Sequence, residues 1–567
     1  MFQISKIKII LITSLFLLLP SVAMAAELSE KTDFFVDPSY DLQKREKITA
    51  VLQRISDNLY FYLDASWWDN LDIDKRKEVN IAIDDLSREF ENKIYPVLTS
   101  NFGSEWKPGI DGDTKITILI HPMIEMASGY FNTGDEYPLA QVKTSNQREM
   151  IYLNSNNITS PLNKGFLAHE FVHLITFNQK DKAYGVSEET WLNEARAEYA
   201  PTLLGYDEQY QNSYLQNRLK IFIENPQESL TEWQGKTSDY GVANIFVHYL
   251  VDHYGKEILI DSLKSGKTGI PSLNEALAKN GFKDDFSQIF TNWTIAIFVN
   301  NCNFGPKYCY LNNNLKTLKI TPFIYYLPTA GESTLSVGYS TKEWAGNWQK
   351  IIGGKASLKL DFTGSGGVNF KIPYIVEDST GKISVKFLSL DQSQKGTLIA
   401  QDEKIISLTV IPSVQNKLAN FTDQEPSYRF FWSVTTEQSG TGEQTELIKQ
   451  LQARIEALLA QIAYLQAQLG AMSNEGETAC NAFGSDLYYG MVQSIEVRCL
   501  QEFLKNQGEA IYPEGLITGN FLSLTQAAVI RFQEKYASEI LAPLNLERGT
   551  GYFGVLTRQV ANRLLPK

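Results

Sequence analysis

The stretch LAHEFVHLITF, residues 167–177, places two of the chain's five histidines four residues apart, with a glutamate directly after the first. Residues four apart lie on one face of an α-helix, so His169 and His173 can hold one metal ion between them. Glu170 can then take a proton from a water that the metal polarises. The apolar neighbours also fit a plain buried helix, and the motif alone leaves both interpretations open.

A catalytic zinc site needs a third protein ligand and an open position for water. The segment ETWLNEARAEYA, residues 189–200, has the pattern of a helix with Glu194 and Glu198 four residues apart. We expect Glu194 to complete a set of two histidines and one glutamate around Zn²⁺. Glu198, one turn later, can accept a hydrogen bond from a ligand histidine. Two glutamates on a helix are also common surface residues, but the apolar neighbours here favour a partly buried position.

The motifs HEFVH and WLNEARAEY resemble the gluzincin clan of zinc metallopeptidases. The preceding segments DGDTKITILI, GYF and SNQREMIYL more narrowly resemble the hyicolysin-like family of that clan. The similarity covers about residues 40–300, and Glu194 matches the clan's glutamate ligand. The chain departs from the clan at Ala195, where glycine is common. The resemblance implies an α+β zincin-type peptidase domain that uses zinc and cleaves proteins.

Members of the clan stabilise the oxyanion of the tetrahedral intermediate with a tyrosine or histidine from a later helix. The segment SDYGVANIFVHYLVDHYG offers four candidates, which are Tyr240, His248, Tyr249 and His253. Tyr240 is preferred, because it follows Ser238 and Asp239 at an expected helix start. His121 follows a strand and precedes a proline, which favours a structural role.

The loop GIDGDT, residues 109–114, contains an Asp-Gly-Asp triplet of the kind found in calcium sites. It lacks the further ligands and the terminal glutamate of an EF-hand loop. The favoured interpretation is therefore a tight turn at Asp111–Asp113 before the next strand.

The length of 567 residues exceeds what one hydrophobic core usually supports, so several domains are expected. Helical periodicity occupies residues 40–100, and strands follow it. Further helices are expected over 164–179, 190–204, 208–224 and 239–254. Strands followed by helices favour an α+β zinc metallopeptidase domain over residues 27–316.

Residues 318–436 contain short alternating segments rich in β-branched and aromatic residues, which is typical of an all-β sandwich. A polar linker at 437–445 leads to residues 446–470, in which isoleucine and leucine recur at 3/4 spacing as a heptad seam. This pattern fits a homodimer through a two-stranded coiled coil. It fits equally a helix or spacer within one chain.

Residues 479–567 contain a weak repeat, in which GNFLSLTQAAV at 519–529 matches GYFGVLTRQVA at 551–561. Each copy is expected to form a turn that leads into a helix, with Thr525 and Thr557 as N-caps. The region resembles the small all-α three-helix peptidoglycan-binding domain. The residues that match its motifs are Val497, Leu500, Gln501, Phe532 and Gln533.

Residues 1–25 have the lysines, apolar run and small-residue exit of a secretory signal peptide, with an uncleaved membrane anchor as the alternative. Export to an oxidising compartment favours two local disulfides, Cys302–Cys309 and Cys480–Cys499. The net charge of −13 disfavours binding to nucleic acid.

Together these features predict a secreted, cell-wall-associated zinc endopeptidase that acts on protein or peptide substrates and is tethered to peptidoglycan by its C-terminal domain. Two alternatives stay open: a peptidoglycan-degrading zinc hydrolase and a non-catalytic cell-wall protein. The resemblance to protein-cleaving enzymes argues against the first alternative. The complete set of metal ligands argues against the second.

Overall fold

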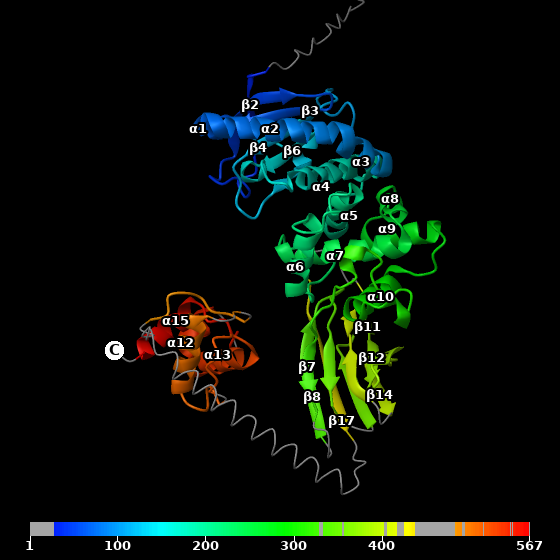
Figure 1. Ribbon diagram of the computed structural model, residues 1–567, viewed down its shortest axis with the longest axis vertical. Helices are drawn as coiled ribbons and strands as arrows, with labels where there is room; N and C mark the ends of the chain where they lie inside the picture. Colours follow the sequence, from blue (N-terminus) through cyan, green and yellow to red (C-terminus); the bar gives the residue numbers. More distant parts are fainter. Residues whose placement is uncertain are drawn as a thin grey trace, which may run out of the picture. The chain divides into compact units, whose positions relative to one another are not determined.

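The computed structural model describes residues 28–327, 333–353, 357–401, 405–416, 425–436, 482–489, 491, 494–513, 515–544, 546 and 548–565 (Figure 1). The chain divides into two compact units, Met1–Ile448 and Lys449–Lys567. The expected signal peptide at 1–25, the linker at 437–445 and the coiled coil at 446–470 lie outside the described residues. Within the described ranges, no helix is both long and apolar enough to cross a membrane.

The first unit begins with a six-stranded sheet in the order β1-β2-β3-β4-β6-β5. Its central strands β3, β4 and β6 are parallel, and the outer strands pair antiparallel with their neighbours. The short strand β5 forms one edge of the sheet. The strands are β1 (Lys31–Phe35), β2 (Lys47–Ile55), β3 (Leu59–Asp64), β4 (Ile116–His121), β5 (Gly129–Tyr130) and β6 (Met150–Asn154).

The first helices of this unit lie beside the sheet, and the later ones lie progressively farther from it (Figure 1). They are α1 (Ala65–Asn70), α2 (Ile73–Glu89), α3 (Tyr95–Phe102), α4 (Asn163–Thr176), α5 (Thr190–Leu203), α6 (Tyr214–Glu224), α7 (Thr237–Tyr254), α8 (Glu257–Leu263), α9 (Gly269–Lys279) and α10 (Phe286–Val299). The shorter turns are η1 (Phe90–Ile94), η2 (Thr133–Glu136), η3 (Ser155–Asn157), η4 (Phe177–Lys182), η5 (Cys302–Phe304) and η6 (Asn313–Leu315).

Each face of the sheet packs into a hydrophobic core of its own. Successive residues of a strand point to opposite sides, so one strand contributes to both cores. On β4, Ile118 and Ile120 belong to the large core that includes α2 and α4. Leu119 belongs to a separate core on the opposite face, with Tyr62 and Tyr152 from the neighbouring strands. Helix α4 packs against the sheet and is buried at every residue from Leu167 to Thr176, which fixes the position of the histidines that it carries.

The structure confirms the helices expected at 164–179, 190–204 and 239–254, which correspond to α4 with η4, α5 and α7. Two other predictions were wrong. Residues 47–64 form strands β2 and β3 instead of a helix, since their β-branched and aromatic side chains divide between the two faces of the sheet. The helix expected from residue 208 begins at Tyr214, because the Ser213 side chain caps it by accepting a hydrogen bond from the Gln216 backbone.

After α10 the chain forms two further sheets, in the orders β14-β10-β17-β8 and β13-β12-β15-β9-β7, and a small β11-β16 pair. The two larger sheets share one core, to which β10 contributes Leu360, β15 Leu408 and β17 Trp432. The strands are β7 (Phe323–Tyr326), β8 (Ser333–Thr341), β9 (Gln349–Ile352), β10 (Ser357–Gly364), β11 (Phe370–Lys371), β12 (Pro373–Asp378), β13 (Ile383–Phe387), β14 (Lys395–Gln401), β15 (Ile405–Val410), β16 (Ser413–Val414) and β17 (Tyr428–Thr436).

Two buried tryptophans join these sheets to the helices. The Trp344 ring centre lies 4.8 Å from that of Phe286 and 5.3 Å from that of Phe290, both on α10. Trp348 Nε1 donates a hydrogen bond of 2.9 Å to the carbonyl of Thr294 on the same helix. Both tryptophans belong to the same core as α4 and α5. The expected boundary between the metallopeptidase region and the all-β region, at residues 316–318, therefore lies within one continuous hydrophobic core.

The second unit contains α12 (Ile495–Asn506), α13 (Ser523–Lys535), α14 (Ala537–Ile540), η7 (Ala542–Leu544) and α15 (Val555–Leu564). The expected repeat is built around two glutamines. Gln501 Nε2 donates to Thr525 Oγ1 at 2.8 Å, and Gln533 Nε2 donates to Thr557 Oγ1 at 3.0 Å. Each Oε1 accepts two backbone N–H groups from the turn before the next helix.

The N-cap prediction for the two threonines was wrong. Leu522 and Gly554 occupy the N-cap positions of α13 and α15. Thr525 and Thr557 lie in the first turn of each helix, where their hydroxyls accept the glutamine hydrogen bonds. Each threonine hydroxyl therefore binds a glutamine from an earlier helix instead of capping its own helix.

The expected Cys302–Cys309 disulfide is present and closes the loop after α10. Cys499 is also disulfide-bonded. Cys480, its expected partner, lies outside the described residues.

Candidate metal centre

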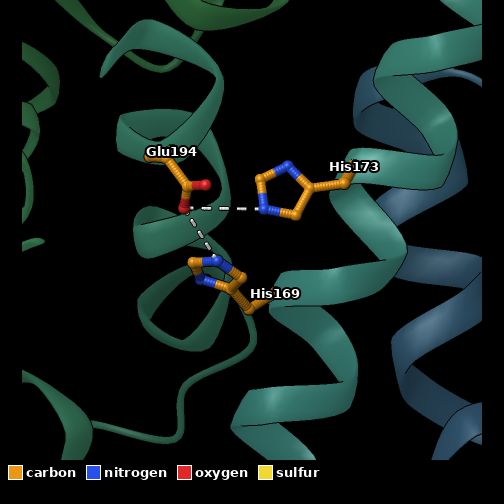
Figure 2. Close-up of side chains that lie close together, drawn as sticks. All are labelled: His169, His173 and Glu194. Atoms are coloured by element: carbon orange, nitrogen blue, oxygen red, sulfur yellow. Dashed lines mark hydrogen bonds and ion pairs between the residues drawn. The ribbon is translucent and has the colours of Figure 1, made fainter. Parts of the chain in front are cut away.

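Helices α4 and α5 bring three metal-binding side chains to one point (Figure 2). His169 and His173 project from α4, and Glu194 projects toward them from α5. Glu194 Oε2 lies 3.1 Å from His169 Nε2 and 3.5 Å from His173 Nε2. The three ligand atoms all lie within 4.8 Å of one another. The three residues expected to bind the metal are thus assembled.

The spacing of these atoms fits zinc. Nitrogen and oxygen ligands at roughly 2.0–2.2 Å from a tetrahedral ion lie about 3.3–3.6 Å from each other. The distance of 3.5 Å lies within that range, and the distance of 3.1 Å lies just below it. Two imidazoles and one carboxylate form a donor set that zinc prefers, and three protein ligands leave a fourth position for water or substrate.

The charges of the site favour a cation. Burial opposes a charge on His173, but the Glu194 carboxylate outweighs burial and raises the His173 pKa to about 9. Burial likewise opposes the charge on Glu194, yet the neighbouring imidazoles, His173 first, lower its pKa well below the usual range. A metal ion at this point would therefore compete with a proton on His173.

Glu170 lies beside the ligands and is buried. Burial raises its pKa above the usual glutamate range, and the two histidines only partly offset that effect. Strand β5 lies close to it, since a Cβ on Gly129 would lie 3.1 Å from Glu170 Cγ and 2.7 Å from the Tyr152 carbonyl oxygen. A side chain at position 129 would push the strand away from Glu170. The sequence pattern of GYFNTGDEYP is typical of a loop, and it did not point to a role for Gly129.

Glu198 lies behind His169, fully buried. Its Oε1 is 3.5 Å from His169 Nδ1 and accepts a 2.5 Å hydrogen bond from the Tyr214 hydroxyl. Arg218 forms two hydrogen bonds of 2.8 Å to the Glu198 carboxylate. The Tyr214 hydroxyl also lies 3.4 Å from His169 Nδ1. With Nδ1 held in this way, Nε2 of His169 faces Glu194 and the metal position.

Sequence reasoning missed Tyr214 and Arg218, both of which lie on α6. Only an indirect sign of these two residues is present in the sequence. A glutamate such as Glu198 on the buried side of a helix needs a cation or hydrogen-bond donors from elsewhere in the fold. It also missed Asn193, which comes directly before Glu194. Asn193 is close enough to His173 to contribute to the rise in the His173 pKa.

Tyr240 lies in the first turn of α7, near the metal position. Its ring centre is 6.3 Å from that of His169, and the Arg218 guanidinium lies 4.8 Å from the Tyr240 ring centre. The negative charge of Glu194, followed by burial, raises the Tyr240 pKa far above its ordinary value. The phenol therefore keeps its proton and can donate a hydrogen bond.

The other candidates for oxyanion stabilisation are engaged elsewhere. His248 Nε2 lies 2.8 Å from Thr202 Oγ1, and its Nδ1 lies 2.8 Å from the Asn244 carbonyl oxygen. The Tyr249 hydroxyl donates to the Lys307 carbonyl, and His253 is hydrogen-bonded to the Cys309 carbonyl. His121 is buried against Asp41, with 3.2 Å between Nδ1 and Oδ2. These contacts stabilise the fold around α7 and β4.

Comparison with known proteins gives a similarity in sequence to a metalloprotease. No family model matches the chain. The neutral metalloprotease ShpI of Staphylococcus hyicus is 26% identical over 245 residues, which cover 37% of this chain and 52% of ShpI. The chain thus spans about half the length of this curated relative.

Two of the matching solved structures resemble the chain only weakly. PliG, a periplasmic inhibitor of g-type lysozyme from Aeromonas hydrophila, is 9% identical with a TM-score of 0.15, covering 20% of this chain and 95% of PliG. CorA, a surface-associated copper-binding protein of Methylomicrobium album BG8, is 10% identical with a TM-score of 0.14, covering 20% of this chain and 98% of CorA. Scores this low do not bear on fold or function.

Proposed function

We propose that the chain is a secreted zinc metalloendopeptidase whose α+β domain, residues 27–316, is of the zincin type. The observation that carries the proposal is the convergence of His169, His173 and Glu194, with Glu170 beside them. The similarity to a neutral metalloprotease supports it.

In this proposal His169, His173 and Glu194 would hold zinc, which when bound would supply a Lewis acid that lowers the pKa of a water molecule. Glu170 would accept a proton from a water molecule as the water oxygen attacks the carbonyl carbon of the peptide bond. Burial raises the pKa of Glu170 in the metal-free site. The same carboxyl group would later return the proton to the leaving amine nitrogen. Tyr240 donates a hydrogen bond to the oxygen of the substrate carbonyl as it gains negative charge.

The substrate is proposed to bind in extended form along strand β5. This strand forms the edge of the sheet, and Gly129 brings it against Glu170. A peptide that pairs with such an edge gains main-chain hydrogen bonds irrespective of its side chains. The edge therefore suits an enzyme that cleaves proteins within the chain.

The C-terminal unit is proposed to tether the enzyme to peptidoglycan, after export directed by residues 1–25. The two glutamine-centred half-repeats support the resemblance to a peptidoglycan-binding domain, since Gln501 and Gln533 make equivalent contacts. Self-association through residues 446–470 stays a prediction.

A zymogram with casein in one gel and purified peptidoglycan in the other tests the proposed function. We expect clearing of casein, no clearing of peptidoglycan, and loss of clearing in 1,10-phenanthroline. Clearing of peptidoglycan alone would instead indicate a peptidoglycan-degrading hydrolase. No clearing in either gel, with zinc bound, would indicate a non-catalytic protein.

A further inference from the structure

An exposed aromatic ring ends a row of stacked tyrosines at the edge of the first sheet. Tyr152 on β6 and Tyr130 on β5 pair across the sheet, and their ring centres lie 4.1 Å apart with planes 8° apart. The Tyr40 ring stacks on Tyr130 at 4.7 Å and 15°. Two rings cannot cover the same face of Tyr130, so Tyr40 and Tyr152 lie on opposite faces of it. Tyr40 therefore lies on the open side of β5, the edge strand of the sheet.

Ile124 extends the apolar surface that Tyr40 begins. Asp41 and Met123 form an antiparallel bridge and are fully buried, and the Ile124 backbone N–H donates a 2.9 Å hydrogen bond to the Tyr40 carbonyl. Because side chains alternate along an extended chain, Tyr40 and Ile124 face away from the core. They are 37% and 36% exposed. Two apolar side chains are thus exposed side by side.

This surface lies near the proposed catalytic residues. Gly129 on β5 lies against Glu170. Burial, followed by the charge of Asp37, raises the Tyr40 pKa, and the carboxylates of Glu170 and Glu194 add to this rise. Tyr40 is therefore close enough to the metal position for its hydroxyl to be affected by the charges there.

A buried ion-pair network holds the loop that carries Tyr40. Asp41 accepts hydrogen bonds from the backbone N–H and the guanidinium of Arg45, at 3.0 and 2.7 Å. Arg45 also forms a 2.7 Å ion pair with Asp64 at the end of β3, and Asp41 lies beside His121 at the end of β4. The sheet thus fixes the backbone at Tyr40, so its ring can bind a partner with little loss of conformational entropy.

A peptide that pairs with β5 would bring side chains to this surface. In an extended chain, alternate side chains point to opposite faces of the sheet. On β5, Gly129 faces Glu170 and Tyr130 faces the core on the other side. Substrate side chains on the Tyr130 side would therefore meet Tyr40 and Ile124. The side chains directly before and after them in the peptide would point toward the metal position.

We propose that Tyr40 and Ile124 form a substrate-binding surface that accepts one large apolar side chain, aromatic or aliphatic, of a peptide lying along β5. The inference rests on the proposed peptidase function and adds a side-chain preference to it. The open face of Tyr40 would continue the row of rings, since aromatic side chains stack favourably on one another. The nearby carboxylate of Asp37 would repel an acidic side chain at the same position.

The test uses the full, zinc-loaded chain and internally quenched peptides. In each peptide, a single position near the cleaved bond is varied among phenylalanine, leucine, alanine and aspartate. At one position we expect kcat/KM to be at least about tenfold higher for phenylalanine or leucine than for alanine, and lowest for aspartate.

Variants assign this preference to the surface. Tyr40→Ala should reduce the phenylalanine-to-alanine ratio of kcat/KM at that position about tenfold, and Ile124→Ala should reduce the leucine-to-alanine ratio. The ratios at the two adjacent positions should stay the same. Tyr40→Phe keeps the ring and should keep the preference. Tyr326→Ala, at a tyrosine 72% exposed on β7, serves as the matched control and should behave as the wild type. Zinc content and Tm, measured on every variant, report on the metal centre and the fold.

Two outcomes would overturn the inference while leaving the peptidase function in place. One is a side-chain preference that is the same in Tyr40→Ala and in the wild type. The other is faster cleavage next to large side chains by Tyr40→Ala, which would show that the ring excludes them. If the zinc-loaded wild type cleaves neither casein nor any peptide, the proposed function itself fails, and the inference fails with it.

Discussion

The carboxylate of Glu194 brings a negative charge into a buried position between two histidines, and each neighbouring group adjusts to that charge. His173 gains a proton more readily, and Tyr240 holds its proton more firmly. Glu198 and Arg218 form an internal ion pair that orients His169 from behind. At the scale of single residues, these effects lead to two predictions.

The first prediction concerns Tyr240. Replacing Tyr240 with Phe removes one hydrogen-bond donor aimed at the developing oxyanion, so kcat for a peptide substrate should fall by about 10²–10³-fold with KM nearly unchanged. Tyr184→Phe, at an exposed tyrosine that bonds to the Lys264 carbonyl, serves as the control and should keep the wild-type kcat. A wild-type kcat in the Tyr240 variant would assign oxyanion stabilisation to another group.

The second prediction concerns pH and metal binding. Because the pKa of His173 is about 9 without metal, this residue is protonated at neutral pH, and zinc must displace that proton. Apparent zinc affinity should therefore rise about tenfold for each pH unit between pH 6 and 8. Titration of the metal-free protein against a zinc-buffering chelator measures this slope, and an affinity independent of pH would contradict the predicted competition with a proton.

At the scale of elements, the sequence pattern predicted the helices that carry the site, because α4, α5 and α7 are rich in apolar residues over several turns and are largely buried. Spacing alone suggested Glu194 and Glu198 as a pair on one helix. Strand β5 could not be predicted in the same way, since two residues become a strand only by pairing with β6. Tyr214 and Arg218, the residues of α6 that bind Glu198, could not be predicted either, because they reach Glu198 only through a tertiary contact.

The contact between α10 and Trp344 leads to the third prediction. Trp344→Ala opens a cavity between Phe286 and Phe290, and we expect the free energy of unfolding of the first unit to fall by about 3–5 kcal/mol. Phe431→Ala, at a residue 55% exposed on β17, should have a much smaller effect. Denaturant unfolding measures both. Equal losses would show that the tryptophan does not couple the sheets to the helices.

At the scale of the whole molecule, the length of the chain predicted several domains but not how closely two of them pack together. The α+β region and the two facing sheets share one interior through Trp344 and Trp348, so the change in sequence pattern near residue 318 marks a change of architecture within one compact unit. The second unit contains none of the metal ligands.

This separation gives the fourth prediction. Deletion of residues 449–567 should leave hydrolysis of soluble casein unchanged, because all the proposed zinc and catalytic residues lie in the first unit. The same deletion should abolish co-sedimentation with purified peptidoglycan. Full co-sedimentation of the truncated chain would contradict the proposed role of the C-terminal unit.

The central claim is that Glu170 serves as the base at a zinc centre formed by His169, His173 and Glu194. The most direct test is to measure zinc content and casein hydrolysis together in the wild type and in Glu170→Gln. We predict about one zinc per chain in both proteins, with hydrolysis by the variant reduced by at least about 10³-fold. A variant that hydrolyses casein at the wild-type rate, or a wild-type protein that hydrolyses casein without bound zinc, would contradict it.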